Sequence, residues 1–240
     1  MNRAGIALKD TGQSAQGSSA AGWRESKWLA LCELAIVVLI FIADWRLLIP
    51  FSKTPFILLV GWISLRLRKV GWRTVGFARY RSWTITAAIG IVCGVLMEAF
   101  QLLATQPLLA RLTGKQPDLS DFRMLTGNLK LTLAGLTLAW TLAAFGEELV
   151  YRGYLMNRIA DLGNRTRLAW ICSVLGVNAA FGFSHWYQGV TGQVEEGIAG
   201  LLLALLYLRT GHNLSAPIIA HGVADTIDLL LIFWGKFHGM

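Results

Sequence analysis

The apolar residues of this chain fall into long blocks separated by short polar segments, rather than into the one-sided stripes of amphipathic helices. A block of about 20 apolar residues can cross the hydrocarbon core of a bilayer as a helix. The pattern therefore predicts an all-α, polytopic transmembrane helix bundle of about seven spans. The predicted spans are 28–49, 55–67, 83–103, 129–145 with its helix continuing to 156 or beyond, 168–185, 197–208 and 214–234.

The segments outside these blocks divide the chain. Residues 1–27 are rich in Gly, Ser, Gln and Ala without an apolar centre, so they predict a disordered cytoplasmic tail and not a signal peptide. An integral membrane domain, 28–240, follows. Within it, 104–128 carries Pro and Gly residues and predicts a loop with a short surface helix. Residues 188–196 are polar and acidic and are predicted to form another loop.

Composition supports a membrane protein. Hydrophobic residues make up 55% of the 240 residues, the mean hydropathy is +0.52, and only 15% of residues are charged, where a soluble domain has about 25%. The net charge of +8 would suggest a nucleic-acid partner in a soluble chain. Here basic loops facing the cytoplasm account for it, so membrane lipid is expected as a partner and nucleic acid is not. Cys32, Cys93 and Cys172 lie in apolar blocks without metal-type spacing and predict core residues.

The distribution of Lys and Arg predicts an orientation. With the N-terminus in the cytoplasm and seven crossings, 15 of the 22 basic residues fall on the cytoplasmic side. Such an excess is typical of cytoplasmic loops. The chain is therefore predicted to lie in a bacterial-type inner membrane, with the N-terminus inside and the C-terminus outside.

The fourth span ends in two adjacent carboxylates, Glu147 and Glu148, within the stretch Phe-Gly-Glu-Glu-Leu-Val-Tyr-Arg of 145–152. Acids beside hydrocarbon are costly, on the order of several kcal/mol, unless they are paired or serve a function. Glu148 and Arg152 are four residues apart and face each other on a helix, so they can be a structural ion pair as well as site residues. Glu147 lies about 100° round the helix without a local partner, which makes it the first functional candidate.

Two further apolar blocks carry polar side chains on one helical face. In the fifth span these are Asn178, Phe181 and His185, and in the seventh they are His221 and Asp225, with Asp228 a turn further on. Facing lipid would be prohibitive for such groups, so three separate helices are predicted to direct them into a common polar cavity. Carboxylates and imidazoles gathered there are suited to activating water or binding a cation. A buried acid, Glu98, and a GxxxG pair, Gly90 and Gly94, mark the third span for close packing.

The order of these motifs resembles the CPBP family of intramembrane proteases, which includes the type II CAAX prenyl endopeptidases and the bacteriocin self-immunity proteins. The resemblance covers a protease-like core, residues 129–234. It is carried by Glu-Glu-x-x-x-Arg from Glu147, Phe-x-x-x-His ending at His185, and His-x-x-x-Asp from His221. Asp225 ends the last motif where the prenyl endopeptidases have Asn, which points to the wider family.

The resemblance implies an endopeptidase that hydrolyses a peptide bond within or next to the bilayer. Glu147 and His185 would activate water, and His221 and Asp225 would stabilise the oxyanion. Catalytic roles are also expected for Glu148 and Arg152. Asn178 and Phe181 are candidate substrate-binding residues, with an interhelical hydrogen bond and simple packing as their alternatives. The substrate would be a peptide or protein, of which prenylated carboxy-terminal peptides are the family's best-known example.

Two chemical questions stay open at the level of sequence. No His-Glu-x-x-His motif is present, and no metal is expected, yet Glu147, His185 and His221 could form a three-ligand zinc site. Asp225 must be protonated to stabilise an oxyanion, because an ionised carboxylate would repel it. An ionised Asp225 would instead orient His221.

Other functions are also open. A catalytically silent membrane scaffold or immunity protein could keep the same residues and act by binding. A proton-coupled transporter could use the buried acids, but it would be expected to show internal repeats with broken helices, and the sequence contains no convincing repeat. The hydrolase is the function that the motif order favours.

Overall fold

The computed structural model describes residues 22–23, 26–78 and 82–237, and these residues form helices and connecting segments without a β-strand. Most of the predicted tail, residues 1–21 and 24–25, lies outside the described part. The α-helices are α2 (Lys27–Trp45), α3 (Thr54–Leu67), α4 (Trp83–Phe100), α5 (Gln106–Thr113), α6 (Leu129–Leu138), α7 (Met156–Leu162), α8 (Arg167–Phe183), α9 (Gly189–Arg209) and α10 (Ser215–Phe233). Shorter segments are the 3₁₀ turns η1 (Trp72–Val75), η3 (Ser120–Leu125) and η6 (Trp186–Gln188), and the π-helical segments η2 (Gln101–Thr105), η4 (Ala139–Glu147) and η5 (Leu149–Leu155).

Five continuous helical stretches in the described residues are long and apolar enough to cross a membrane: Lys27–Trp45, Trp83–Thr113, Leu129–Leu162, Trp186–Arg209 and Ser215–Phe233. The chain is therefore an integral membrane protein. The other two predicted spans correspond to apolar helices of 14 and 17 residues, α3 and α8. Both are shorter than the roughly 20 residues that a perpendicular crossing needs.

The helix that carries the two adjacent glutamates runs unbroken from Leu129 to Leu162, as predicted for the fourth span. Its middle is widened into the π-helical segments η4 and η5, which meet at Glu148. A π-helical turn adds one residue to a helical turn and changes the direction of the side chains that follow. Such segments are frequent at functional sites.

Two predicted loops are helical in the structure. Residues 188–196 were predicted as a loop, which is wrong, because α9 begins at Gly189. Its first half buries Thr191, Gly192 and Glu195 at helical spacing, and this packing outweighs the low helix propensity of its glycines. The segment after Leu103 is also partly helical, since the third helix continues through η2 and α5 to Thr113.

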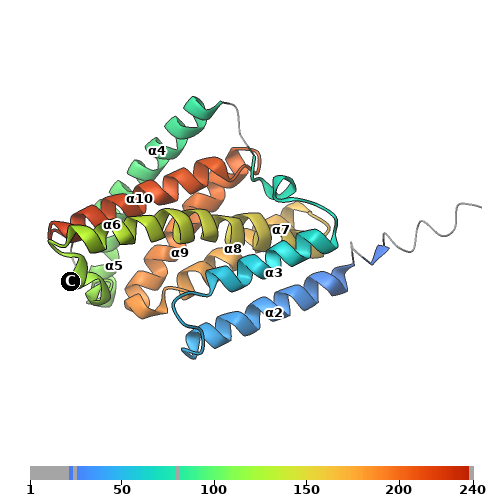
Figure 1. The fold of residues 1–240 in the computed structure, drawn as a ribbon, viewed down its shortest axis with the longest axis horizontal. Coiled ribbons are helices and arrows are strands. Elements are labelled where there is room, and N and C mark those ends of the chain that lie inside the picture. Colours follow the sequence, from blue (N-terminus) through green and yellow to red (C-terminus); the bar gives the residue numbers. More distant parts are fainter. Residues whose placement is uncertain (1–21, 24–25, 79–81, 238–240) are drawn as a thin grey trace, which may run out of the picture.

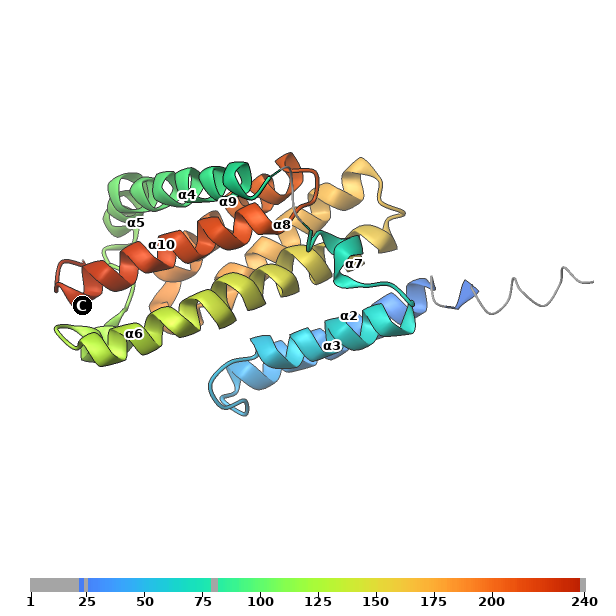
Figure 2. The same ribbon diagram turned by 45° about the horizontal axis from the view of Figure 1, so that its top comes forward.

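Helix α10 is surrounded by other helices. Figure 1 shows α10 running between α4 and α6, and Figure 2 shows the antiparallel pair α2 and α3 set to one side, against the α6–α7 helix. The largest buried cluster lies around η5 and contains Tyr151, Tyr154, Phe181 and Tyr207. Outward-facing leucines, isoleucines and tryptophans on α2, α3 and α4 are exposed, as expected for helix faces that contact lipid.

The GxxxG pair of the third span lies where α4 crosses α10, as its spacing indicated. A Cβ atom added at Gly94 would lie 2.5 Å from the Ala220 carbonyl oxygen and 2.8 Å from the Val223 Cβ. One added at Gly90 would lie 2.5 Å from the Ile219 Cβ. The two helices can approach this closely only because neither position has a side chain.

We expect Gly94→Ala to lower the stability of the folded protein by about 1–3 kcal/mol, the usual cost of overpacking. Gly176→Ala is the matched control, because a Cβ at that exposed position of α8 meets no atom within 4 Å. Alanine there should be neutral or stabilising, since it has the higher helix propensity. Thermal unfolding in detergent measures both variants, and equal midpoints would contradict the close packing of α4 on α10.

Candidate active site

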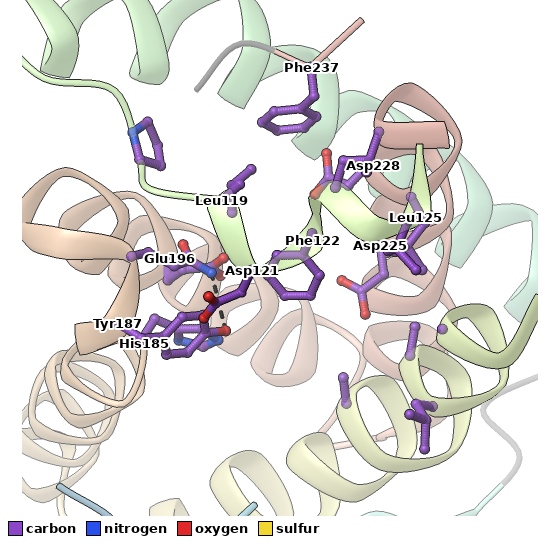
Figure 3. Close-up of a pocket in the computed structure, with 18 of the residues that line it drawn as sticks. Leu119, Asp121, Phe122, Leu125, His185, Tyr187, Glu196, Asp225, Asp228 and Phe237 are labelled. Carbon is purple, nitrogen blue, oxygen red and sulfur yellow. Dashed lines mark hydrogen bonds between the residues drawn. The ribbon is translucent and has the colours of Figure 1, made fainter. Parts of the chain in front are cut away.

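A cavity of about 570 Å³ opens between the Leu129–Leu162 helix, η3, η6, α9 and α10. Figure 3 shows His185 and Tyr187 on one side of it and Asp225 and Asp228 on the α10 side. Four predicted site residues line it: Glu147, His185, His221 and Asp225. The four come from two helical stretches, Leu129–Leu162 and α10, and from the turn after α8. The cavity thus brings together the acid, the two imidazoles and the aspartate of the three sequence motifs.

The lining of this cavity is acidic. Six carboxyl side chains line it and, among the described residues, no Lys or Arg does. The six are Asp121, Glu147, Glu195, Glu196, Asp225 and Asp228. A protein with a net charge of +8 therefore keeps its basic side chains out of this hollow. A cavity with such a lining must hold water, protons or cationic groups, because unbalanced carboxylates in an apolar surrounding are costly.

Glu147 stands at the end of η4, where its side chain is partly exposed to the cavity. Among the described residues no donor hydrogen-bonds or ion-pairs with its carboxylate. A carboxylate that is open to a cavity and not occupied by a protein donor can accept a proton from water. This is the environment that the sequence indicated for Glu147, in contrast to that of its neighbour.

Glu148 is fully buried and does not line the cavity. Its Oε1 atom accepts a hydrogen bond from Arg152 Nη1 at 2.7 Å, and His221 Nδ1 lies 3.0 Å from the same oxygen. An ionised carboxylate has no proton to give, so Nδ1–H of His221 is the donor. Glu148 therefore ties the Leu129–Leu162 helix to α10 and fixes the orientation of the His221 ring.

Arg152 also forms hydrogen bonds with two more helices, α8 and α9. Its Nη2 atom donates to the Gly200 carbonyl oxygen at 2.7 Å and to Asn178 Oδ1 at 3.2 Å. The guanidinium carbon lies 4.7 Å from the centre of the Phe181 ring. A Cβ at Gly200 would come within 3.1 Å of Nη2 and 2.8 Å of the Asn178 oxygen, so only glycine leaves room for this contact.

Asn178 and Phe181, the candidate substrate-binding residues, are 3% and 1% exposed and do not line the cavity. They lie behind it, against Arg152. The same is true of Arg152 itself, which is completely buried. The predicted site residues therefore form two groups. One group lines the cavity, and the other, the supporting layer, lies behind it and holds the lining residues in place.

His185 follows the C-terminal end of α8, where its ring packs between Phe181 and Tyr187 with centroids 5.0 and 5.9 Å away. Its Nδ1 atom lies 3.0 Å from the Phe181 carbonyl oxygen. A carbonyl can only accept, so Nδ1 carries the proton in this hydrogen bond. In a neutral ring this leaves Nε2 as an unprotonated acceptor, the form that a general base needs.

His221 has carboxyl groups on both sides of its ring. Besides the Nδ1 contact with Glu148, its Nε2 atom lies 3.5 Å from Asp225 Oδ1. Asp225 is one turn further along α10, and its side chain is 25% exposed. His221 and Asp225 thus both line the cavity from α10, and the buried glutamate holds the imidazole.

The described residues do not fit a zinc site. No group of three or more His, Cys, Asp or Glu side chains among them is placed to hold a metal ion. Of the three candidate ligands, His221 already directs both ring nitrogens at carboxyl groups. The arrangement of these donors therefore does not support a step through a bound metal.

Sequence reasoning missed Glu195 and Glu196, because it placed both in a loop. In α9, Glu195 is 3% exposed, and both side chains line the cavity. The available signal was the spacing of Thr191, Glu195 and Ala199, which repeats every four residues and continues the buried face of the following apolar block. Glu98 was recognised as a buried acid, and on α4 it is 2% exposed.

Comparison with known proteins identifies the family. Residues 129–227 match the family model described as type II CAAX prenyl endopeptidase Rce1-like. This part of the chain is a domain of that family, which is part of the CPBP class that the three motifs indicated. The matched region contains all four lining residues of the predicted site and the buried pair behind them. No curated protein and no solved structure matches the chain.

Removing the guanidinium of Arg152 tests the buried connection. We expect Arg152→Met to lower the free energy of unfolding by about 3–5 kcal/mol, because it leaves the Glu148 carboxylate buried without its main partner. Arg165→Met is the matched control. It breaks another (i, i+4) pair, with Asp161 at 2.7 Å, but one in which the arginine side chain is 48% exposed, so its loss should cost about 1 kcal/mol or less.

Chemical denaturation in detergent provides the measurement. The double variant Glu148→Leu, Arg152→Met should be more stable than Arg152→Met alone, since it removes the uncompensated charge together with its partner. If the double variant has a lower free energy of unfolding than Arg152→Met alone, the proposed role of this ion pair is contradicted.

Proposed function

We propose that this protein is an intramembrane endopeptidase that hydrolyses a peptide bond with a water molecule activated by Glu147 and His185. The observation that carries the proposal is the single cavity lined by Glu147, His185, His221 and Asp225 in a helical membrane protein of the CPBP class. An unpaired carboxylate and an imidazole with a free nitrogen are the two bases that water activation needs.

In the proposed reaction, the water donates a proton to Glu147 as its oxygen attacks the carbonyl carbon of the scissile peptide. The Nε2 atom of His185 accepts the second hydrogen bond of that water and so orients it. The carbonyl becomes a tetrahedral oxyanion. Collapse of this intermediate breaks the carbon–nitrogen bond, and the proton held by Glu147 passes to the leaving amine.

His221 would act as an imidazolium, with Nδ1–H bonded to Glu148, and would stabilise the oxyanion through Nε2–H together with the carboxyl group of Asp225. Because Asp225 donates in this role, it acts in its protonated form. Glu148, Arg152 and Asn178 are assigned positioning roles: they hold the His221 ring and join the helices around the cavity, and Phe181 packs against the guanidinium. The substrate would reach the lining residues without touching this supporting layer.

The site would lie near the cytoplasmic end of the membrane in a seven-span arrangement. Glu147 is 18 residues beyond Leu129, which corresponds to about 27 Å along a helix, close to the roughly 30 Å thickness of the hydrocarbon core. In this arrangement α3 and α8 complete the crossings despite their length. The expected substrate is a peptide inside or beside the bilayer, and prenylated carboxy-terminal peptides are the candidates that the family description suggests.

Loss of the proposed bases should abolish hydrolysis and leave the fold intact. We expect Glu147→Gln and His185→Ala each to reduce cleavage by at least about 100-fold without lowering the unfolding midpoint. Mass-spectrometric peptide mapping of membranes from cells with wild type or Glu147→Gln reports both the activity and the target. Asp118→Asn, an exposed acid outside the cavity lining, is the matched control. Identical peptide maps would favour a scaffold that acts by binding.

The role of Asp225 can be separated from that of the bases. We expect Asp225→Asn to keep or raise the cleavage rate, because an amide donates a hydrogen bond to an oxyanion without having to be protonated. Asp225→Leu, which cannot donate, should be inactive. An inactive but stably folded Asn variant would instead show that an ionised Asp225 orients His221. Cleavage of the target found by peptide mapping provides the assay.

A further inference from the structure

A second cavity, of about 670 Å³, lies at the end of the molecule where α2 begins, α3 ends and the turn between α7 and α8 emerges. These three places are close together on one side in Figure 1. Five basic side chains line the cavity and one acidic side chain does. The basic residues are Lys27, Arg68, Lys69, Arg158 and Arg165, and the acid is Asp161. The cavity has no residue in common with the candidate active site.

The positive charges in this basic pocket exceed the acids that could balance them. Arg158 and Arg165 share one carboxylate, that of Asp161, at 2.9 and 2.7 Å. Arg68 pairs with Glu33 from α2. Neither Lys27 nor Lys69 has an acidic partner among the described residues. The pocket and its neighbours therefore hold five cations against two carboxylates.

One of these cations is buried with a donor unused. Arg158 is 6% exposed, and its Nε atom is buried without a hydrogen-bond partner. A buried N–H that lacks an acceptor typically costs about 1–3 kcal/mol, more for a charged group. The arginine lines the pocket, so an anion bound there would lie beside its guanidinium and offset the cost of the buried charge. This unsatisfied donor is the observation that distinguishes the pocket from an ordinary basic surface.

The beginning of α2 adds to the positive potential. Lys27 is its first residue, and its first turn contains no acid to balance the positive end of the helix dipole. Ser26 caps the helix by accepting from the Trp28 amide at 3.2 Å, while other amides of that turn are left for a ligand. A lysine at this position is unfavourable for an isolated helix, and an anion bound beside it would offset that cost.

We propose that the basic pocket binds a phosphate group, carried by an anionic ligand. The position of the pocket favours a phospholipid headgroup over a soluble phosphate ester as the source. It lies where the candidate span Lys27–Trp45 begins and where the apolar helix α3 ends, which is the depth of lipid phosphates. Basic pockets between membrane helices bind anionic headgroups in this way. The proposal is independent of the proposed hydrolase activity.

The test uses the full-length protein in a neutral detergent and titrates it with phosphatidylglycerol, phosphatidylcholine or inorganic phosphate. Native mass spectrometry counts the bound lipids, and thermal unfolding reports stabilisation. The variant is Lys27→Gln, Lys69→Gln, which removes the two cations that have no partner and so disturbs no ion pair. The matched control is Arg73→Gln, Arg209→Gln. It removes the same charge from two exposed basic residues outside the pocket.

We expect phosphatidylglycerol to bind and stabilise the wild type and the control, and to bind the Lys27, Lys69 variant about 25-fold more weakly, at roughly fivefold per lysine. Phosphatidylcholine should have little effect in all three proteins. If inorganic phosphate stabilises the wild type as well as phosphatidylglycerol does, the phosphate site stands and its ligand is soluble. Equal phosphatidylglycerol binding by the Lys27, Lys69 variant and the control would overturn the proposal.

Discussion

The structure depends on one buried carboxylate, that of Glu148. A carboxylate in a dry interior is strongly unfavourable unless donors surround it, and here Arg152 and His221 supply them to a single oxygen, Oε1. Arg152, which pairs with this carboxylate, also donates hydrogen bonds to Asn178 of α8 and to the Gly200 carbonyl of α9. Four helical stretches are thus fixed relative to one another by a set of charge-assisted contacts. The positions of the cavity-lining side chains follow from this arrangement, because each stands on or beside one of the connected helices.

The two adjacent glutamates have different environments because of the helix that carries them. Successive residues of a helix point in directions about 100° apart, and the π-helical segments on either side of Glu148 widen the turns around it. Glu148 points into the protein, where its Oε1 atom accepts from Arg152 and His221. Glu147 points into the cavity, where no described residue occupies its oxygens. The pair therefore combines a buried, paired carboxylate and a cavity-facing carboxylate at consecutive positions of one helix.

Much of this organisation could be predicted from the sequence because acids and histidines are rare in apolar blocks. Glu147, His185, His221 and Asp225 were recognisable for that reason, and the structure brings all four to one cavity. The partition into lining and supporting residues could not be predicted, since it depends on helix rotation and on a close contact that only Gly200 allows. Glu195 and Glu196 were missed because Gly and polar residues at the beginning of α9 lower its apparent helix propensity. Whether α3 and α8 cross the bilayer depends on tilt and packing, which apolar length does not determine.

The charge distribution shows why a basic protein can keep an acidic hollow. Six carboxyl groups line the cavity, and a further acid, Glu98, is buried on α4. A basic side chain in the cavity would pair with Glu147 and remove the free carboxylate that the proposed chemistry needs. Five of the basic residues instead line the separate pocket at the other end of α2, α3 and α7, so these cations and the cavity-facing carboxylate of Glu147 lie in different cavities.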